Sequence, residues 1–170
     1  FHSPVAVLAD LTWLDSLPAA DRRSGSAEML KVAATHDRAL FDELRAELSL
    51  PLIARAAAIK AEVVSRDEFE TGERKVLNFG HTFGHAFESA AGLTALRHGE
   101  AVALGMLAET SFSIGRGYAQ AATLTALEAA CARLELPSDW QRWAERGSEF
   151  LQHDKKRAGT QVRLPVVPEI

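Results

Sequence analysis

Three of the six histidines in the sequence fall close together, at His81, His85 and His98. If residues 80–91 form a helix, His81 and His85 lie at positions i and i+4 on one face, where two imidazoles can converge on one small ligand. Neutral imidazole is the commonest metal-binding side chain, and several such groups from separate elements can form a zinc site. The alternative is one hydrogen-bonded core histidine beside two solvated ones. Residue type and spacing alone leave both interpretations open.

Charged residues also gather near these histidines. Residues 67–75 contain four carboxylates and two cations around a glycine, which is typical of a solvated polar loop. Further upstream, Glu28 and Lys31 stand at i and i+3 on an otherwise apolar stretch. Their spacing predicts a modest surface ion pair.

The elements that must position these groups are mainly helical. The chain has 170 residues, 47% of them apolar and 25% charged, which fits one globular domain. Apolar residues recur at three and four positions, as at Leu40, Leu44 and Leu48, and this predicts a multi-helix bundle of seven or eight helices. The helices include a pair at 121–134 and 140–151, whose aromatic residues we expect in the core: Trp140, Trp143 and Phe150. Short strands are expected near both ends, at 5–10 and 162–167.

Composition argues against several classes of partner. A net charge of −4 provides no basic surface for nucleic acid, and no run of eighteen apolar residues suggests a membrane span. The single cysteine, Cys131, cannot form an internal disulfide and lies among alanines, which favours a buried thiol and a reducing, cytoplasmic location. The sequence begins without methionine, so we expect it to start inside a longer polypeptide.

Five motifs, in this order and spacing, resemble 3-dehydroquinate synthase. They are AExxK at 27–31, KAEVV at 60–64, an acidic stretch ending in arginine at 67–74, LNFGHTFGHA at 77–86 and HGEAVA at 98–103. Residues 4–18 and the lysine pair at 155–156 extend the resemblance over nearly the whole chain. Five linked motifs are far more specific than one histidine pair. The resemblance implies the fold of this family, a mainly α multi-helix domain, in agreement with the helical bundle predicted from periodicity.

The resemblance also implies a role for individual residues. The family's metal ligands correspond to Glu28, His81 and His98. This leaves His85 as a proton-transfer group. Two imidazoles and one carboxylate leave positions open on zinc, as in catalytic sites. Glu70 matches a proton-accepting residue. Substrate contacts match Lys31, Lys60, Arg74, Asn78 and one or both of Lys155 and Lys156.

The activity implied is conversion of 3-deoxy-D-arabino-heptulosonate 7-phosphate to 3-dehydroquinate and phosphate, a lyase step of the shikimate pathway to aromatic amino acids. It uses zinc, or another divalent metal such as cobalt, and NAD. Residues 1–170 would be the C-terminal metal- and substrate-binding domain of a homodimer, without the N-terminal NAD-binding domain, and inactive alone. The alternatives are a related sugar-phosphate cyclase, a metal-dependent glycerol or alcohol dehydrogenase, and a non-catalytic metal-binding fragment.

Overall fold

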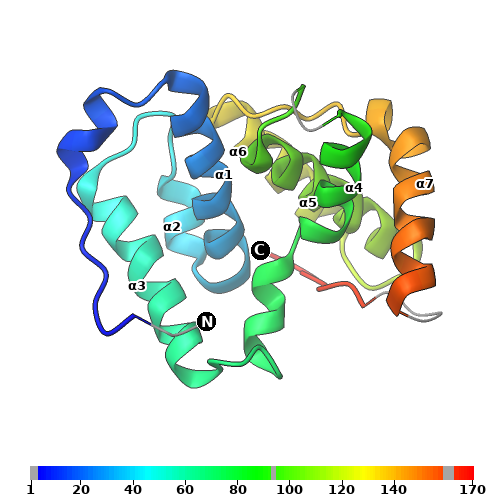
Figure 1. The fold of residues 1–170 in the computed structure, drawn as a ribbon, viewed down its shortest axis with the longest axis horizontal. Helices are drawn as coiled ribbons and strands as arrows, with labels where there is room; N and C mark the ends of the chain where they lie inside the picture. Colours follow the sequence, from blue (N-terminus) through cyan, green and yellow to red (C-terminus); the bar gives the residue numbers. More distant parts are fainter. Residues whose placement is uncertain (1–3, 93–94, 159–162) are drawn as a thin grey trace.

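Seven α-helices and two short 3₁₀ helices make up the described part of the chain in the computed structural model (Figure 1). The structure describes residues 4–92, 95–158 and 163–170, with side chains described as far as Leu151 and again from Arg163. In chain order the elements are η1 (Leu11–Asp15), α1 (Ala19–His36), α2 (Arg38–Glu43), α3 (Leu50–Arg66), η2 (Glu73–Asn78), α4 (His81–Ala90), α5 (His98–Gly115), α6 (Ala121–Arg133) and α7 (Gln141–Ala158). The predicted helical bundle is confirmed.

Helix ends fall at residues whose local chemistry favours them. Ser49 precedes α3, whose second residue is Pro51, a position where the missing proline N–H costs nothing. The Asp37 side chain accepts a hydrogen bond from Leu40 N and caps α2. Gly80 precedes α4 with φ of 81°, a left-handed conformation that glycine adopts without strain. The helix that carries His81 therefore begins where the sequence predicts.

Helix α5 is the centre of the molecule. It is buried almost continuously from Gly99 to Thr110 and packs against α1, α4 and α6, while α7 covers the other side of α4 (Figure 1). The main core joins side chains of α1, α2, α5 and α6, and the predicted burial of Cys131 is confirmed. Because α1, α4 and α5 carry Glu28, His81 and His98, the packing of α5 determines where these three residues meet.

Glycines allow the helices around α5 to approach at backbone distance. A Cβ on Gly105 would lie 1.9 Å from the Gly80 carbonyl oxygen and 2.6 Å from Gly84 N, both in or beside α4. A Cβ on Gly99 would lie 2.0 Å from the Ser24 carbonyl oxygen in α1. No side chain fits at either contact, so glycine is required by close approach rather than by turn geometry.

The predicted strands are wrong for the described residues. Residues 5–10 form no strand, and Val5, Val7 and Leu8 are exposed by 81% or more. Residues 163–167 form none either: Val167 packs into the helical core, and the next residue's carbonyl oxygen accepts hydrogen bonds from the start of α6. A strand needs a neighbouring ladder of backbone groups, whereas these segments face solvent and a helix. Val162 lies outside the described residues.

The aromatic residues of the last helical pair divide between core and surface. Trp140 and Trp143 are partly buried against the core, as predicted. Phe150 is 41% exposed, so its predicted core position is wrong. One face of an exposed terminal helix can carry an aromatic residue without burying it. Within the described ranges, no helix is long and apolar enough to cross a bilayer.

We predict that Gly105→Ala lowers the free energy of unfolding by about 1–3 kcal/mol or more, because the added methyl group forces α4 and α5 apart. Gly115→Ala is the matched control, since a Cβ there meets nothing within 4 Å. It should leave stability unchanged or raise it by roughly 0.5 kcal/mol. Chemical denaturation measures both, and equal stability of the two variants would contradict the close-packing account.

Candidate metal site and adjoining pocket

Three side chains from separate helices meet at one point. The Nε2 atoms of His81 and His98 each lie 3.6 Å from Glu28 Oε1. One possible ligand atom from each residue falls within 4.8 Å of the others. The oxygen at the centre, Glu28 Oε1, is buried and has no hydrogen-bond partner. A buried carboxylate oxygen without a partner is costly, and a bound cation would satisfy it.

The charges around Glu28 favour the protonation states that a metal needs. Lys31 Nζ lies 2.7 Å from Glu28 Oε2, and the lysine side chain is only 6% exposed, so the expected surface ion pair is buried. Burial opposes ionisation of Glu28, but Lys31 and the two histidines outweigh it and hold the pKa of Glu28 below its usual value. Burial, then the Lys31 charge, lowers the pKa of His81. The carboxylate is thus ionised and the His81 imidazole neutral, the forms that bind cations.

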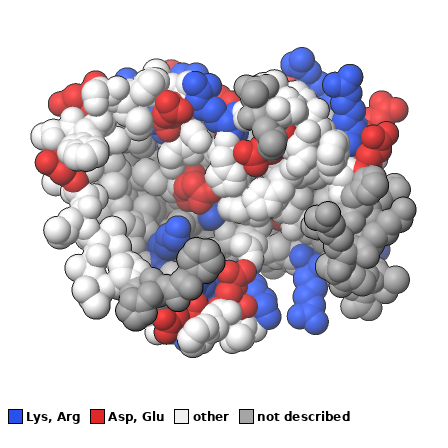
Figure 2. Space-filling model, viewed as in Figure 1, with Lys and Arg blue, Asp and Glu red and all other residues white. Residues whose placement is uncertain are grey.

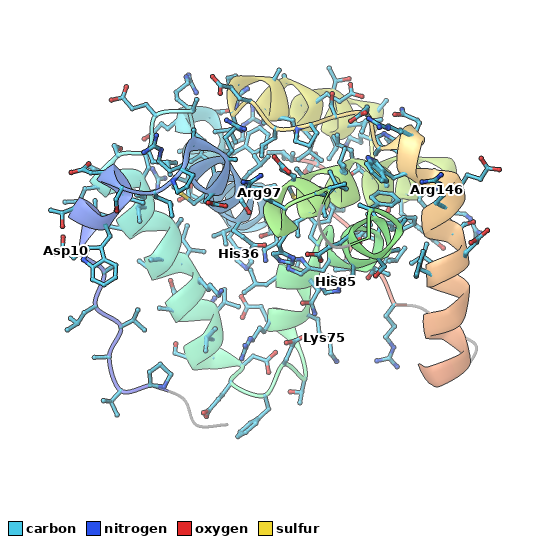
Figure 3. The ribbon with its side chains drawn as sticks, turned by 45° about the horizontal axis from the view of Figure 1, so that its top comes forward. Asp10, His36, Lys75, His85, Arg97 and Arg146 are labelled. Atoms are coloured by element: carbon cyan, nitrogen blue, oxygen red, sulfur yellow. The ribbon has the colours of Figure 1, made fainter. Side chains whose placement is uncertain are left out.

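The third histidine of the cluster packs against the other two rings, but the candidate ligand group that contains Glu28 includes only His81 and His98. The ring centroid of His85 is 5.4 Å from that of His81 and 5.7 Å from that of His98. His85 is exposed near the middle of the molecule (Figure 3). It therefore has the access to solvent that a proton-transfer group needs, while Glu28 lies closer to the other two rings.

A pocket of about 390 Å³ opens next to this trio. Figure 2 shows side chains of both signs around the hollowed middle of this face. A pocket lined by several cations, an amide and carboxylates suits a small ligand with anionic and hydroxyl groups. Its lining residues, all but Leu77 singled out in the sequence, are Glu28, Lys31, Lys60, Glu70, Arg74, Leu77, Asn78, His81 and His98.

The acidic segment before α4 is largely exposed, as expected of a polar loop, and its backbone is held by hydrogen bonds. The Asp67 carboxylate accepts hydrogen bonds from the backbone N–H groups of Thr71, Gly72 and Arg74. These bonds lower the pKa of Asp67 to about 2. Asp67 thereby shapes the loop that carries Glu70 and Arg74 to the pocket.

Glu70 is held in an uncommon backbone conformation at the pocket. Its φ is 55°, in the left-handed region that non-glycine residues seldom adopt. Its side chain accepts a hydrogen bond from Asn78 Nδ2 and lies 4.0 Å from Arg74 Nε. Strained residues of this kind concentrate at functional sites, and Glu70 lines the candidate pocket.

A carboxylate that sequence reasoning missed anchors the start of α4. Glu109, on α5, is fully buried and accepts hydrogen bonds from Gly80 N at 2.8 Å and Thr82 N at 3.2 Å, with Phe83 N at 3.5 Å. These are N–H groups that a helix N-terminus leaves without internal partners, and the helix dipole favours a negative charge there. The available signal was a lone glutamate directly after the apolar run at 101–108.

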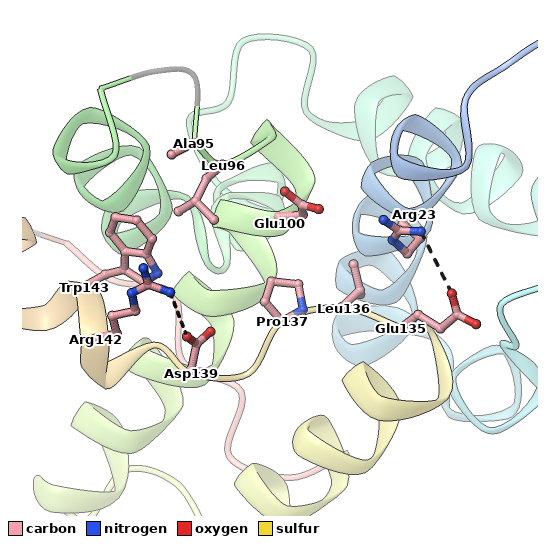
Figure 4. A pocket seen from close by; sticks show the side chains of 10 residues that line it. All are labelled: Arg23, Ala95, Leu96, Glu100, Glu135, Leu136, Pro137, Asp139, Arg142 and Trp143. Atoms are coloured by element: carbon pink, nitrogen blue, oxygen red, sulfur yellow. Dashed lines mark ion pairs between the residues drawn. The ribbon is translucent and has the colours of Figure 1, made fainter.

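A second pocket, of about 600 Å³, lies near the ends of α1 and α7 (Figure 4). Four of its five charged residues pair with one another: Arg23 with Glu135 at 4.0 Å and Arg142 with Asp139 at 3.8 Å. No histidine lines it, and its surface is partly apolar. The pocket beside Glu28 is therefore the better candidate for chemistry.

The structure thus brings together most of the predicted site. The proposed metal ligands Glu28, His81 and His98 converge, and the other predicted groups line the same pocket except for His85 beside it. The side chains of Lys155 and Lys156 lie outside the described residues. Leu77 and Glu109 were not predicted as site residues. Leu77 is identified by its place in the pocket lining, and Glu109 by its burial and its hydrogen bond to Gly80 N.

In this helical domain, α1, α4 and α5 present one carboxylate and two imidazoles that could hold a metal ion beside a polar pocket. Residues 25–157 match the family model described as 3-dehydroquinate synthase C-terminal. The chain belongs to this family.

Relatives with that name cover nearly all of this chain. A 3-dehydroquinate synthase from a Geobacter species is 41% identical over 167 residues, which is 92% of this chain and 46% of the relative. Another, from Xanthomonas oryzae pv. oryzae, is 44% identical over 154 residues, 82% of this chain and 42% of the relative. The chain therefore spans about half the length of these curated relatives.

A solved structure shares the fold. It is a 2-epi-5-epi-valiolone synthase from Streptomyces hygroscopicus subsp. jinggangensis with NAD+ and Zn2+ bound. The TM-score is 0.67 at 30% sequence identity, and the match covers 85% of this chain and 44% of that one. The shared part is again about half of the longer protein.

We predict that protonation of Glu109 sets a pH dependence of stability. Burial raises its pKa to about 7 from 4.5, so the folded chain keeps a proton that the unfolded chain releases. The folded state should therefore lose about 1–3 kcal/mol as the pH rises from about 4.5 to 7. Glu109→Gln removes this titration.

Urea unfolding of both metal-free proteins between pH 5 and 8 measures the effect. The two proteins share every other titrating group, so the difference in their unfolding free energies isolates Glu109. That difference should shift in favour of the variant as the pH rises. Parallel curves would show that Glu109 does not titrate in this range.

Proposed function

We propose that this chain is the metal- and substrate-binding part of a 3-dehydroquinate synthase, acting on 3-deoxy-D-arabino-heptulosonate 7-phosphate. The observation that carries the proposal is the position of the Glu28, His81 and His98 trio at the wall of a pocket lined by cations. The family membership of the chain supports it.

Glu28, His81 and His98 would hold a divalent cation, zinc or cobalt. The donor set fits: the unpartnered Glu28 oxygen faces both Nε2 atoms, and one carboxylate with two imidazoles suits a borderline metal. The related valiolone synthase binds Zn2+. When bound, such an ion supplies Lewis acidity toward substrate hydroxyl and carbonyl oxygens.

The remaining residues of the pocket would bind and orient the substrate. Lys31, Lys60 and Arg74 provide positive charge for the phosphate and carboxylate, and Asn78 can bond to hydroxyl groups. Lys155 and Lys156 stay predicted contacts for the same anionic groups. Orientation of this kind accounts for much of the rate in reactions that close a ring within one molecule.

Two groups could move protons. Glu70 is at the pocket with its carboxylate facing Asn78 and Arg74, and His85 is on the solvent side of His81. A proton acceptor must lie within bonding reach of the substrate, whereas a relay can lie one step outside. Glu70 fits the first role and His85 the second.

Hydride transfer would require NAD bound by a region outside this chain. The related valiolone synthase binds NAD+, and this chain corresponds to 44% of it. We therefore assign NAD binding to an N-terminal domain and expect the 170-residue chain alone to be inactive. A homodimer and a cytoplasmic location stay predictions.

A related sugar-phosphate cyclase is the second candidate. The fold similarity to a valiolone synthase favours it, since that enzyme has the same domain at 30% identity. Identities of 41% and 44% to 3-dehydroquinate synthases favour the first candidate. The trio with its polar pocket is less expected of a non-catalytic fragment.

Metal titration tests the site in the isolated chain. Glu28→Gln and His98→Ala should each weaken zinc binding by a factor of about 100 or more, because each removes a ligand from a three-ligand site. His85→Ala should change the affinity by less than about threefold, since His85 would be outside the ligand set. Equal losses at His85 and His98 would instead support a three-histidine site.

Activity is tested with an N-terminal NAD-binding half joined upstream of residue 1. With NAD and zinc, we expect phosphate release from the heptulosonate phosphate, and loss of at least about 100-fold in rate for Arg74→Ala. Arg45→Ala, an exposed arginine remote from the pocket, is the control. Ring formation from another sugar phosphate, without release from this one, would favour the second candidate.

A further inference from the structure

The imidazole of His98 lies between two carboxylates. Its Nε2 is 3.6 Å from Glu28 Oε1, and its Nδ1 is 3.5 Å from Glu88 Oε2. Glu88 is on α4, whereas His98 begins α5, and the Glu88 side chain is only 24% exposed. One ring nitrogen therefore faces the candidate metal site and the other faces a half-buried acid.

A neutral imidazole carries one proton, so a nitrogen that binds a metal requires the proton on the other nitrogen. That N–H needs an acceptor, and metal-binding histidines commonly donate it to a carboxylate or backbone carbonyl. The Glu88 oxygen occupies this position for His98. The 3.5 Å separation exceeds the usual N–H···O length by roughly 0.5 Å, a distance that a small side-chain rotation closes.

His81 meets the same requirement in a different way. Its Nδ1 lies 3.3 Å from the Phe79 carbonyl oxygen, which can only accept, while its Nε2 faces Glu28. Both histidines thus present the same nitrogen to Glu28 and have an oxygen at the other. The acceptor for His81 is backbone that precedes its own helix, whereas the acceptor for His98 belongs to a different helix.

The placement of Glu88 follows from helix geometry. His81, His85 and Glu88 are at i, i+4 and i+7, so they share one face of α4. His85 on this face is labelled in Figure 3. The face reaches the start of α5, where His98 lies, and Glu88 therefore connects the two helices that carry the histidine ligands.

We propose that Glu88 is a positioning residue: it accepts the Nδ1 proton of His98 and thereby directs Nε2 toward the metal held with Glu28 and His81. The inference rests on the proposed metal site. It assigns a function to a residue that lies outside the pocket and touches neither substrate nor reacting atoms.

A second arrangement uses the same residues differently. His85, Glu88 and His98 also offer ligand atoms within 4.8 Å of one another, as a second ion site would require. His98 cannot use Nδ1 as a ligand there while that atom carries the proton. The positioning role is favoured because Nε2 already faces the buried Glu28 oxygen, whereas His85 is exposed.

The test compares the chain with its Glu88→Ala and Glu88→Gln variants. Cobalt affinity and stoichiometry are measured by visible absorption and chelator competition. Glu88→Ala should weaken binding about 10–100-fold at one ion per chain. Glu88→Gln should recover most of the loss, because its amide oxygen accepts the same proton. Glu128→Gln, an exposed change of equal charge on α6, should bind like the original chain.

Nitrogen-15 NMR of the His98 ring provides a readout that a purely structural role would not change. We expect the Nδ1–H tautomer in the original chain and in Glu88→Gln, and a tautomer mixture in Glu88→Ala. Thermal unfolding of the metal-free proteins checks that each variant folds.

Three results would overturn the inference. They are unchanged affinity and tautomer in folded Glu88→Ala, equal losses in the Ala and Gln variants, and a second bound ion that disappears with Glu88. If the original chain bound no metal, both the proposed site and this inference would fail. If it bound metal and Glu88→Ala behaved identically, only the inference would fail.

Discussion

The backbone contact of α5 with α1 and α4 is the constraint on which the site depends. Gly99 meets Ser24 of α1, whose hydroxyl accepts a hydrogen bond from Gly99 N at 2.9 Å, and Gly105 meets Gly80 before α4. These contacts leave no space for a side chain. Because each helix carries one member of the trio, their separation sets the distances among Glu28, His81 and His98. The geometry of the candidate metal site therefore depends on the packing of the core.

Buried ionisable groups maintain this arrangement. Glu109 occupies the N-terminus of α4 from within α5, and Lys31 is buried against Glu28 in α1. A buried polar or charged group without partners is strongly unfavourable, so each is acceptable only with its partners in place. Loss of one partner leaves the other uncompensated, which ties the electrostatics of the site to the position of the helices.

The helices and most of the site could be predicted from sequence, because periodicity and linked motifs are local signals. The burial of Lys31 and the capping role of Glu109 could not, since both depend on which helices pack together. The same holds for Asp67, whose carboxylate organises a loop that composition describes only as polar. The prediction of two terminal strands was wrong for a related reason. An apolar run favours a strand but does not provide the neighbouring strand that a sheet needs.

X-ray absorption spectroscopy of the zinc-loaded chain tests the ligand set of Glu28, His81 and His98, because it counts ligands by type. We expect two imidazole nitrogens with oxygen ligands at about 2.0–2.2 Å and no sulfur. A shell with three imidazoles would place His85 in the site and contradict its assignment outside the ligand set. A sulfur ligand would require the buried Cys131, and would show that the helices do not pack around the metal as described.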